Sequence, residues 1–491
     1  MRDLIFPVEH HSEISLQAQL RRHLVDAILD NRLASDEPLP SCRRLAQSLG
    51  VSRNTVVLTY QALADEGLLV SRERVGYFVN PELSTVQRAA KAHVRDNIGP
   101  DQVPSALWKR LRLRPSEHTQ ITKPKSWQRY PYPFIYGQAD PSLFPVAAWR
   151  LCSRQALGVT SIRSWTEDSV EADDALLVDE VRTRVLPRRG IKATPEQILM
   201  TMGGQNALYL IAQLLAGRDT TVGVENPGYV DARNIFSVTG ARIKPLPVDH
   251  DGLVIDQRLA ACDCVYVTPS HQSPTTVTLP LERRVALLEQ AARSDIFVIE
   301  DDYEAETNFV HNPTTALKAM DRTGNVIYVG SFSKHLAPGL RIGYMVAAKE
   351  LIGELRSLRR LMLRHPPTNN QRTVAHFISG GYYDALVQRL QRVYQQRWEL
   401  MGAALTKYLP DSATTPSFGG TSYWVRGPDD LDSDVLAREA LAEGIVIEPG
   451  SIHFISPKPP RNYFRLGFSS IADEHIAPGI ERLAKLIHAN T

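Results

Sequence analysis

The segment SFSKHLAPGLRIG at residues 331–343 combines a lysine with hydroxyl groups and an arginine. Ser331 and Ser333 precede Lys334, and Arg341 follows it. A lysine whose pKa is lowered by burial or by nearby charge can form a Schiff base with a carbonyl compound. Hydroxyl groups and a guanidinium can bind a phosphate group. Although most lysines are solvated surface groups, this pattern predicts a Schiff-base lysine beside an anion site.

Five short apolar runs, rich in β-branched residues, each lead into a polar or glycine-containing segment. They predict strands at residues 198–201, 222–225, 265–267, 296–300 and 326–330. Helical stretches separate these runs, which favours βαβ units and a mainly parallel sheet. The polar segments then lie together at the carboxyl ends of the strands, where α/β proteins bind ligands.

Two of these segments suit an anion or a nitrogen ring. Gly203 and Gly204 open an expected helix, whose first N–H groups can hold a phosphate group. An ordinary tight turn is the alternative. Asp301 stands at a strand end, where its carboxylate could pair with a protonated ring nitrogen or cap a helix. Each motif is unspecific alone, and only the combination with Lys334 predicts a site.

Residues 12–80 have the pattern of a small helical module that ends in a β-hairpin. Apolar residues recur every fourth position in the first helix, and Ser41 and Ser52 stand where they would cap two further helices. Gly50 separates these two helices, and alternating residues around Gly76 predict a two-stranded wing. This order of elements predicts a winged helix-turn-helix.

Basic and polar residues gather in the second and third helices of this module. Arg43, Arg44 and Arg53 supply positive charge, and Asn54 follows Arg53. A helix N-terminus attracts phosphate, and Arg and Asn side chains read base edges in the major groove. Positions 1–80 hold 9 basic and 10 acidic residues, so an ordinary helical domain with surface arginines is the alternative. The order of elements favours DNA binding.

The module resembles the winged helix-turn-helix of the GntR regulators over the segment LPSCRRLAQSLGVSRNTVVLTYQALADEGLLVSR. The resemblance implies double-stranded DNA as a partner. By position, it implies DNA contacts from the two helices and the wing at Arg43, Arg44, Ser52, Arg53, Asn54, Thr55, Arg72 and Gly76.

Residues 81–130 are interpreted as a linker. They hold 10 basic and 4 acidic residues, and several prolines interrupt any long helix. A solvated charge run is the ordinary explanation of such a segment, and sequence-independent contacts with DNA phosphates are the alternative.

Residues 131–491 resemble the fold-type I pyridoxal phosphate enzymes of the aspartate aminotransferase superfamily. The resemblance rests on the order Gly-rich turn, Pro-x-Tyr, Asp-x-Tyr, Ser-x-Ser-Lys and late Arg. It implies an α/β fold with a mainly parallel sheet, flanking helices and a smaller C-terminal α/β subdomain. It also implies pyridoxal 5'-phosphate as the cofactor.

The same resemblance assigns roles to individual residues. Lys334 would hold the cofactor as a Schiff base, Asp301 would pair with the pyridine nitrogen, and Tyr229 would stack on the ring. Tyr303 would approach the ring hydroxyl. Arg465 would bind a substrate carboxylate, with a structural salt bridge as the alternative. The phosphate group would be held by Ser331, Ser333, Arg341, Gly203 and Gly204.

Residues 273–276 depart from this family pattern. They read Ser-Pro-Thr-Thr, where typical aminotransferases have Asn-Pro-Thr-Gly. The amide that usually contacts the ring oxygen is therefore missing, which leaves that contact to Tyr303. The preceding Ser-His-Gln at residues 270–272 resembles the regulator branch of the family. The departure favours a sensor over a catalyst.

A GntR-type head before an aminotransferase-like body is the layout of the MocR/GabR regulators, which the chain resembles from end to end. The resemblance implies a homodimer that binds an operator with two half-sites. An amine or amino acid would displace Lys334 to form an external aldimine. The changed dimer geometry would then alter DNA binding.

Two other functions stay open. An aminotransferase with an appended DNA-binding head would transaminate over many turnovers, whereas a regulator would complete at most a half-reaction. A DNA-binding scaffold with an inactive pocket would show no absorbance from a lysine-bound cofactor and would be indifferent to Lys334→Ala.

Composition predicts a multidomain cytoplasmic protein. The chain of 491 residues exceeds the roughly 250–300 at which one core stops growing, and 43% of it is hydrophobic. It has no apolar run of about 18 residues and no secretory signal at its start. Its four cysteines lack metal or redox spacing, so neither a metal site nor a disulfide is expected.

Overall fold

The structure is a computed structural model that describes residues 8–83 (without 11, 13 and 31), 108–308 (without 112), 315–412 and 419–489. The chain divides into two compact units, Met1–Arg112 and Leu113–Thr491. Each unit is described by itself.

Three helices of the first unit each begin behind a serine. These are α1 (Leu16–Leu29), α2 (Cys42–Leu49) and α3 (Arg53–Asp65). The hydroxyl oxygens of Ser15, Ser41 and Ser52 accept hydrogen bonds from backbone N–H groups of the first turns. Gly50 ends α2 in the left-handed conformation, with φ of 66°. The predicted turn between the two short helices is confirmed.

A two-stranded wing follows these helices. Strands β1 (Leu69–Arg72) and β2 (Gly76–Val79) pair antiparallel, with Arg72 opposite Gly76. Leu69 and Val79 join Leu20, Val56 and Leu63 in one apolar core. The first unit is therefore a winged helix-turn-helix, as the residue pattern predicts.

An eight-stranded sheet forms the centre of the second unit, in the order β4-β11-β10-β9-β8-β5-β6-β7. Neighbouring strands pair parallel except at β11 and β7. Its strands are β4 (Ile198–Thr201), β5 (Thr221–Asn226), β6 (Arg242–Asp249), β7 (Gly252–Leu253), β8 (Cys264–Val267), β9 (Phe297–Asp301), β10 (Val326–Ser331) and β11 (Gly343–Val346). All five predicted strands are present.

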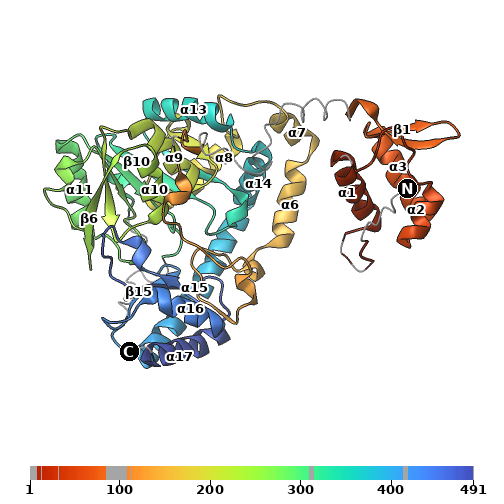
Figure 1. The fold of residues 1–491 in the computed structure, drawn as a ribbon. Coiled ribbons are helices and arrows are strands. Elements are labelled where there is room, and N and C mark those ends of the chain that lie inside the picture. The colour runs from red at the N-terminus through yellow and green to blue at the C-terminus, as the bar shows by residue number, and fades with distance from the viewer. Residues whose placement is uncertain are drawn as a thin grey trace. The chain divides into compact units, whose positions relative to one another are not determined.

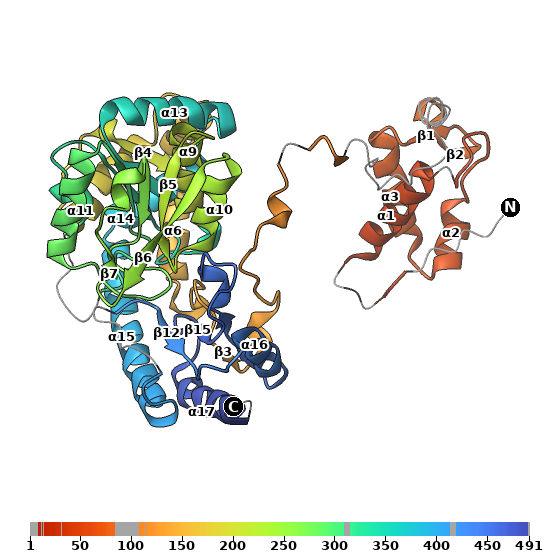
Figure 2. The same ribbon diagram turned by 60° about the vertical axis from the view of Figure 1, so that its left-hand side comes forward.

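Helices cover both faces of this sheet (Figures 1 and 2). On one face, Leu208, Phe236 and Leu355 of α9, α10 and α13 pack against strand residues. On the other face, Leu287 of α11 belongs to a second apolar cluster. These helices and their neighbours are α6 (Val146–Ala156), α7 (Val159–Trp165), α8 (Ala175–Glu180), α9 (Gly204–Leu215), α10 (Val230–Val238), α11 (Leu281–Arg293), α12 (Leu317–Met320), α13 (Lys349–Leu363) and α14 (Thr368–Ser379). A parallel sheet requires such cover, because both of its faces are apolar.

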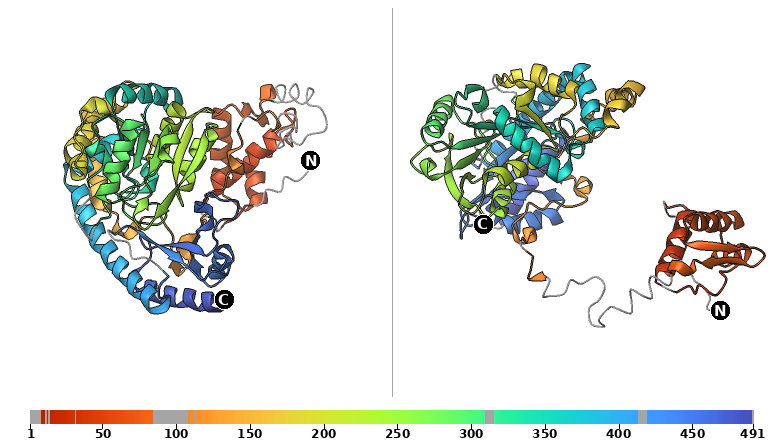
Figure 3. Two further views of the ribbon diagram at one scale, coloured as in Figure 1. Left: turned by 90° about the vertical axis from the view of Figure 1, so that its left-hand side faces the viewer. Right: turned by 90° about the horizontal axis from the view of Figure 1, so that it is seen from above.

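A smaller α/β subdomain completes the second unit. Its sheet has the order β12-β15-β14, and β13 pairs with β3 from the start of the unit. The long helix α15 runs along the unit to reach α17 (Figure 3). The elements are β3 (Tyr132–Pro133), α15 (Tyr382–Tyr408), β12 (Ser422–Arg426), α16 (Ser433–Ala442), β13 (Ile445–Val446), β14 (Glu448–Pro449), β15 (Tyr463–Gly467) and α17 (Asp473–Ala489).

Residues 113–130, which the sequence assigns to the linker, pack with the second unit. The side chain of Asn234 donates to the carbonyl of Thr119 at 2.8 Å, and Lys123 donates to the carbonyl of Tyr136. Residues 113–130 therefore group with the second compact unit, Leu113–Thr491. Residues 84–107 and 112 of the predicted linker lie outside the described residues.

Helices long and apolar enough to cross a membrane are not found in the described part of the chain. Within the same residues, no group of three or more His, Cys, Asp or Glu side chains is placed to hold a metal ion. All four cysteines are free thiols.

Candidate functional site

A cavity of about 390 Å³ lies at the carboxyl ends of the central strands. Most residues predicted for the site line it. They are Gly204, Tyr229, Asp301, Tyr303, Ser331, Ser333, Lys334, Arg341 and Arg465. Gly203 precedes Gly204 as the N-cap of α9. Segments that are more than 200 residues apart in the chain thus meet in one site.

Lys334 follows β10 and carries its ammonium group among aromatic rings. The Nζ atom lies 4.1 Å from the ring centre of Tyr136 and 5.8 Å from that of Tyr303. Burial lowers the pKa of Lys334 to about 8; the carboxylate of Glu304 acts to raise it, and the positive charges of Lys123 and Arg465 act to lower it. A lysine with this pKa has an appreciable neutral fraction near neutral pH, which is the nucleophilic form.

Asp301, the last residue of β9, is buried beside this lysine. The hydroxyl of Tyr266 donates to Asp301 Oδ2 at 2.7 Å. Burial raises the pKa of Asp301 to about 6, although the hydrogen bond from Tyr266 and the charge of Lys334 act to lower it. A cationic partner would keep this carboxylate ionised, because an opposite charge favours the charged form.

The N-terminus of α9 and Arg341 form one corner of the cavity. Gly203 has φ of 79°, a left-handed value that favours glycine, and a Cβ there would stand 3.1 Å from the Arg341 guanidinium. Arg341 donates to the carbonyl of Met202 at 2.8 Å. Ser333 has a buried Oγ that finds no partner among the described residues. The N–H groups of a helix N-terminus, a guanidinium and the Ser333 hydroxyl make this corner suitable for a phosphate group.

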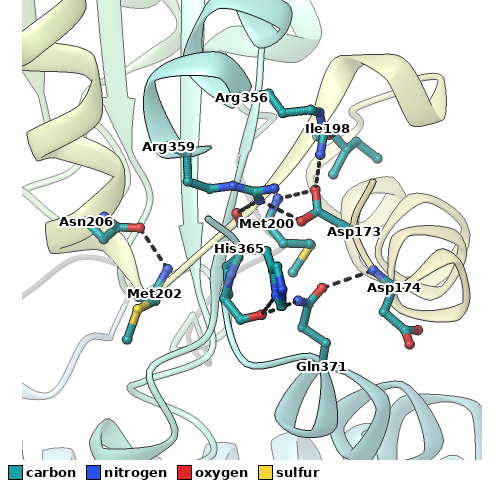
Figure 4. Close-up of polar contacts among 11 residues, drawn as sticks. Asp173, Asp174, Ile198, Met200, Met202, Asn206, Arg356, Arg359, His365 and Gln371 are labelled. Atoms are coloured by element: carbon teal, nitrogen blue, oxygen red, sulfur yellow. Dashed lines mark hydrogen bonds and ion pairs between the residues drawn. The ribbon is translucent and has the colours of Figure 1, made fainter. Parts of the chain in front are cut away.

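Strand β4, which leads into this corner, is held by a buried ion pair (Figure 4). Arg359 of α13 donates to Asp173 Oδ1 and to the carbonyl of Met200, both at 2.6 Å. The N–H of Met200 donates to the other oxygen of Asp173 at 3.2 Å, and Arg356 contacts the same oxygen at 2.8 Å. Since β4 lies at the sheet edge, these side chains satisfy backbone groups that no neighbouring strand pairs.

Tyr229 borders the cavity immediately before α10. Its hydroxyl accepts a hydrogen bond from Gln205 at 3.1 Å and donates to Asp231 at 3.3 Å. Burial, with the nearby carboxylate of Asp231, raises the pKa of Tyr229 far above its ordinary value. The phenol therefore stays neutral, and these bonds fix the ring at the edge of the cavity.

Ser273, at which the chain departs from the family pattern, lines the cavity together with Tyr303. The hydroxyl of Tyr303 donates to the backbone carbonyl of His271 at 2.8 Å. The N–H of Ser273 donates to Thr268 Oγ1 at 3.0 Å, and Ser273 itself lines the cavity. The Tyr303 hydroxyl thus has a protein acceptor of its own, which the sequence pattern did not indicate.

Arg465 is buried with its guanidinium against two groups that the sequence did not single out. Its Cζ atom lies 3.6 Å from the ring centre of Tyr136, and it donates a hydrogen bond to Glu448. Burial acts to raise the pKa of Glu448, but Arg465 and His453 hold that pKa at about 2. The predicted carboxylate-binding arginine therefore has an internal salt bridge and also faces the cavity.

The predicted DNA-binding residues all lie on α2, on the N-terminal part of α3 or on the wing. Arg43, Arg44, Arg53 and Asn54 are exposed. Other members have structural roles. The hydroxyl of Ser52 caps α3 by accepting a hydrogen bond from the N–H of Thr55 at 3.0 Å. In the wing, the Arg72 guanidinium lies 4.2 Å from the ring centre of Phe78, and Gly76 has φ of 133°. The helices thus present a cationic surface, with the wing as a second element.

Two family models match the chain. One describes bacterial regulatory proteins of the gntR family and matches residues 16–79. The other describes aminotransferases of class I and II and matches residues 174–483. The two matches fall on the winged helix-turn-helix and on the second unit.

Curated relatives align with nearly the whole chain. The HTH-type transcriptional regulator TauR of Rhodobacter capsulatus is 42% identical over 475 residues, which cover 96% of each protein. The probable rhizopine catabolism regulatory protein MocR of Rhizobium meliloti is 31% identical and covers 97% of this chain and 94% of its own length.

Among solved structures, the α-aminoadipate aminotransferase LysN of Thermus thermophilus matches with a TM-score of 0.67 and 29% identity. The match covers 73% of this chain and 92% of that enzyme, which was solved with N-(5'-phosphopyridoxyl)-L-leucine. The second unit thus has the fold of aminotransferases that use pyridoxal phosphate.

Proposed function

Because this chain belongs to the MocR-type transcriptional regulators, in which a GntR-family domain precedes an aminotransferase-like domain, we propose that its second unit senses an amine through pyridoxal phosphate at Lys334. The observation that carries the proposal is the lysine itself, whose ammonium has a pKa lowered to about 8 inside a cavity at the strand ends.

The residues of the cavity fit this cofactor chemically. Pyridoxal phosphate supplies an aldehyde carbon to which a primary amine adds covalently. Lys334 would hold that carbon, the buried carboxylate of Asp301 would face the ring nitrogen, and Tyr229 would lie against the ring. The phosphate group would lie in the corner at the N-terminus of α9, where the buried hydroxyl of Ser333 has no partner among the described residues. Its ligands there would be Ser331, Ser333, Arg341, Gly203 and Gly204.

The remaining roles follow from the two units. Residues 12–80 bind DNA, and the second unit binds the effector and forms the homodimer. The two DNA-binding domains of the dimer then bind two half-sites of an operator in the cytoplasm. Arg465 favours an effector that carries a carboxylate beside its amine. The effector switches DNA binding only if it binds the two dimer geometries with different affinity.

An aminotransferase with an appended DNA-binding head is less well supported. Three relatives that align with 96% or 97% of the chain are named as transcriptional regulators or as a regulatory protein. Sustained transamination of an amino donor and a keto acid would nevertheless favour the enzyme. At most a half-reaction is expected of the regulator.

A footprint of the promoter next to the gene, repeated with a panel of amines and amino acids, tests the proposed function. We expect a protected region with two half-sites, whose protection changes with some members of the panel only when the cofactor is present. Protection that no amine changes would contradict a sensor role. Protection that is absent altogether would contradict the role of the first unit.

A further inference from the structure

Lys123 brings another positive charge into the cavity that holds Lys334 and Arg465. Three cationic groups surround the ring of Tyr136: Arg465 Cζ lies 3.6 Å from its centre, Lys334 Nζ 4.1 Å and Lys123 Nζ 5.9 Å. Burial lowers the pKa of Lys123 and Arg465 acts in the same direction, whereas the carboxylates of Glu448 and Asp231 act to raise it. Like charges this close repel one another.

Carboxylates offset part of this charge: Asp231 and Asp301 line the cavity, and Glu304 acts to raise the pKa of Lys334. Glu448 neutralises Arg465 through their salt bridge. The acceptor that Lys123 binds is the carbonyl of Tyr136, which is neutral. An ammonium group has three N–H donors, so Lys123 has capacity for a further acceptor. An anion that entered the cavity would use this capacity.

The position of Lys123 sets the length of a suitable ligand. A Cβ placed on Gly137 would stand 2.8 Å from Lys334 Nζ and 3.6 Å from Lys123 Nζ. Both ammonium groups thus approach one point of the cavity. In a ligand whose amine takes the place of Lys334, an acidic group reaches Lys123 if only a few carbon atoms separate it from that amine.

We propose that Lys123 determines effector specificity by binding the anionic end of a short amino acid, together with Arg465. The inference rests on the proposed function, since it assumes that the effector amine reacts at Lys334. Lys123 lies in residues 113–130, through which the linker enters the second unit. The effector therefore touches this entry segment directly.

The test uses the full-length protein loaded with pyridoxal phosphate. Straight-chain amino acids of increasing length are titrated against their own amides, and the change in cofactor absorbance gives each Kd. Wild type should bind at least one acid about tenfold or more tightly than its amide, because a charge-assisted hydrogen bond is lost in the amide. Lys123→Gln should remove most of that preference, because the Kd of the acids rises far more than the Kd of the amides.

Two further variants separate recognition from folding. Lys123→Arg keeps the charge and should restore the preference for the acid. Lys125→Gln removes a lysine of the same segment that does not line the cavity, and it should behave as wild type. Lys123→Gln should also raise the pH at which cofactor-free protein takes up pyridoxal phosphate half-maximally, because a like charge near Lys334 is gone.

An unchanged ratio of acid to amide Kd in Lys123→Gln would overturn the inference, as would a wild type that prefers no acid of the series. These outcomes are distinct from failure of the proposed function. If the proposed function is wrong, wild type itself would show no absorbance of a lysine-bound cofactor.

Discussion

The guanidinium of Arg465 donates a hydrogen bond to the carboxylate of Glu448 inside the cavity that holds Lys334. The arginine that the family pattern assigns to an effector carboxylate thus already binds a carboxylate of the protein. An acidic effector must share Arg465 with Glu448 or displace it. Because removing one partner of a buried ion pair is costly, sharing requires less free energy than displacement.

Glu448→Gln should tighten the binding of amines that carry an acidic group. The substitution keeps a hydrogen-bonding group beside Arg465 and removes the negative charge that competes with the ligand. We expect the Kd of amino acids to fall about tenfold, while that of their amides stays within about twofold. Absorbance titration of the loaded protein measures both. Weaker binding of every acid in this variant would contradict a competing role for Glu448.

The loading of cofactor-free protein should depend on pH through Lys334. Only the neutral amine attacks an aldehyde, and burial lowers the pKa of Lys334 from its ordinary 10.5 to about 8. The loading rate should rise with pH and be half-maximal near pH 8. Stopped-flow absorbance measures the rate. A midpoint near 10.5 would show that Lys334 is not perturbed.

The same shift affects the stability of the cofactor-free second unit. The folded state has the lower pKa, so it releases the proton of Lys334 before the unfolded state does. The cost of burying the charged amine is therefore fully present below pH 8 and is relieved as the pH rises from about 8 to 10.5. Lys334→Met should remove this contribution to the pH dependence of the free energy of unfolding.

Asp173→Ala should destabilise the second unit. The change leaves the guanidinium of Arg359 buried without its carboxylate and frees the edge of β4, for a loss of about 3–5 kcal/mol. Denaturant unfolding measures this loss. The double variant with Arg359→Met should regain part of it, because the buried charge is removed as well. A single variant within about 0.5 kcal/mol of wild type would contradict the role of the ion pair.

Arg53→Ala should weaken operator binding by about 1–3 kcal/mol without changing the cofactor absorbance. Arg53 is exposed in the first turn of α3 and is predicted to meet DNA. Arg22→Ala is the matched control, since Arg22 is exposed on α1 and lies outside the predicted DNA contacts. Loss of cofactor absorbance together with DNA binding would argue against independent units.

The predictable parts of this structure depend on local chemistry. Ser41, Ser52 and Gly50 mark the helix ends of the first unit, because capping involves residues within one turn of each other. The strands of the second unit correspond to short apolar runs followed by polar residues. Since strand ends converge in a parallel sheet, the residue pattern alone predicts that Lys334 and Asp301 line one cavity.

The missed residues depend on contacts between distant segments. Glu448 meets Arg465 because β14 pairs with β15, and no spacing rule relates these two residues to the cavity. Lys123 stands in a basic, proline-containing segment whose composition indicates a solvated linker. Its ammonium reaches Tyr136 only once residues 113–130 pack on the second unit. Such contacts can be identified only in the tertiary structure.

The most direct test of the central claim compares the operator affinity of wild type and Lys334→Ala, both with pyridoxal phosphate, before and after addition of the amine found by footprinting. Fluorescence anisotropy with labelled operator DNA gives the Kd. We predict that the amine changes the Kd of wild type about fivefold or more, whereas Lys334→Ala binds operator but does not respond. A response of Lys334→Ala equal to that of wild type would contradict sensing through Lys334.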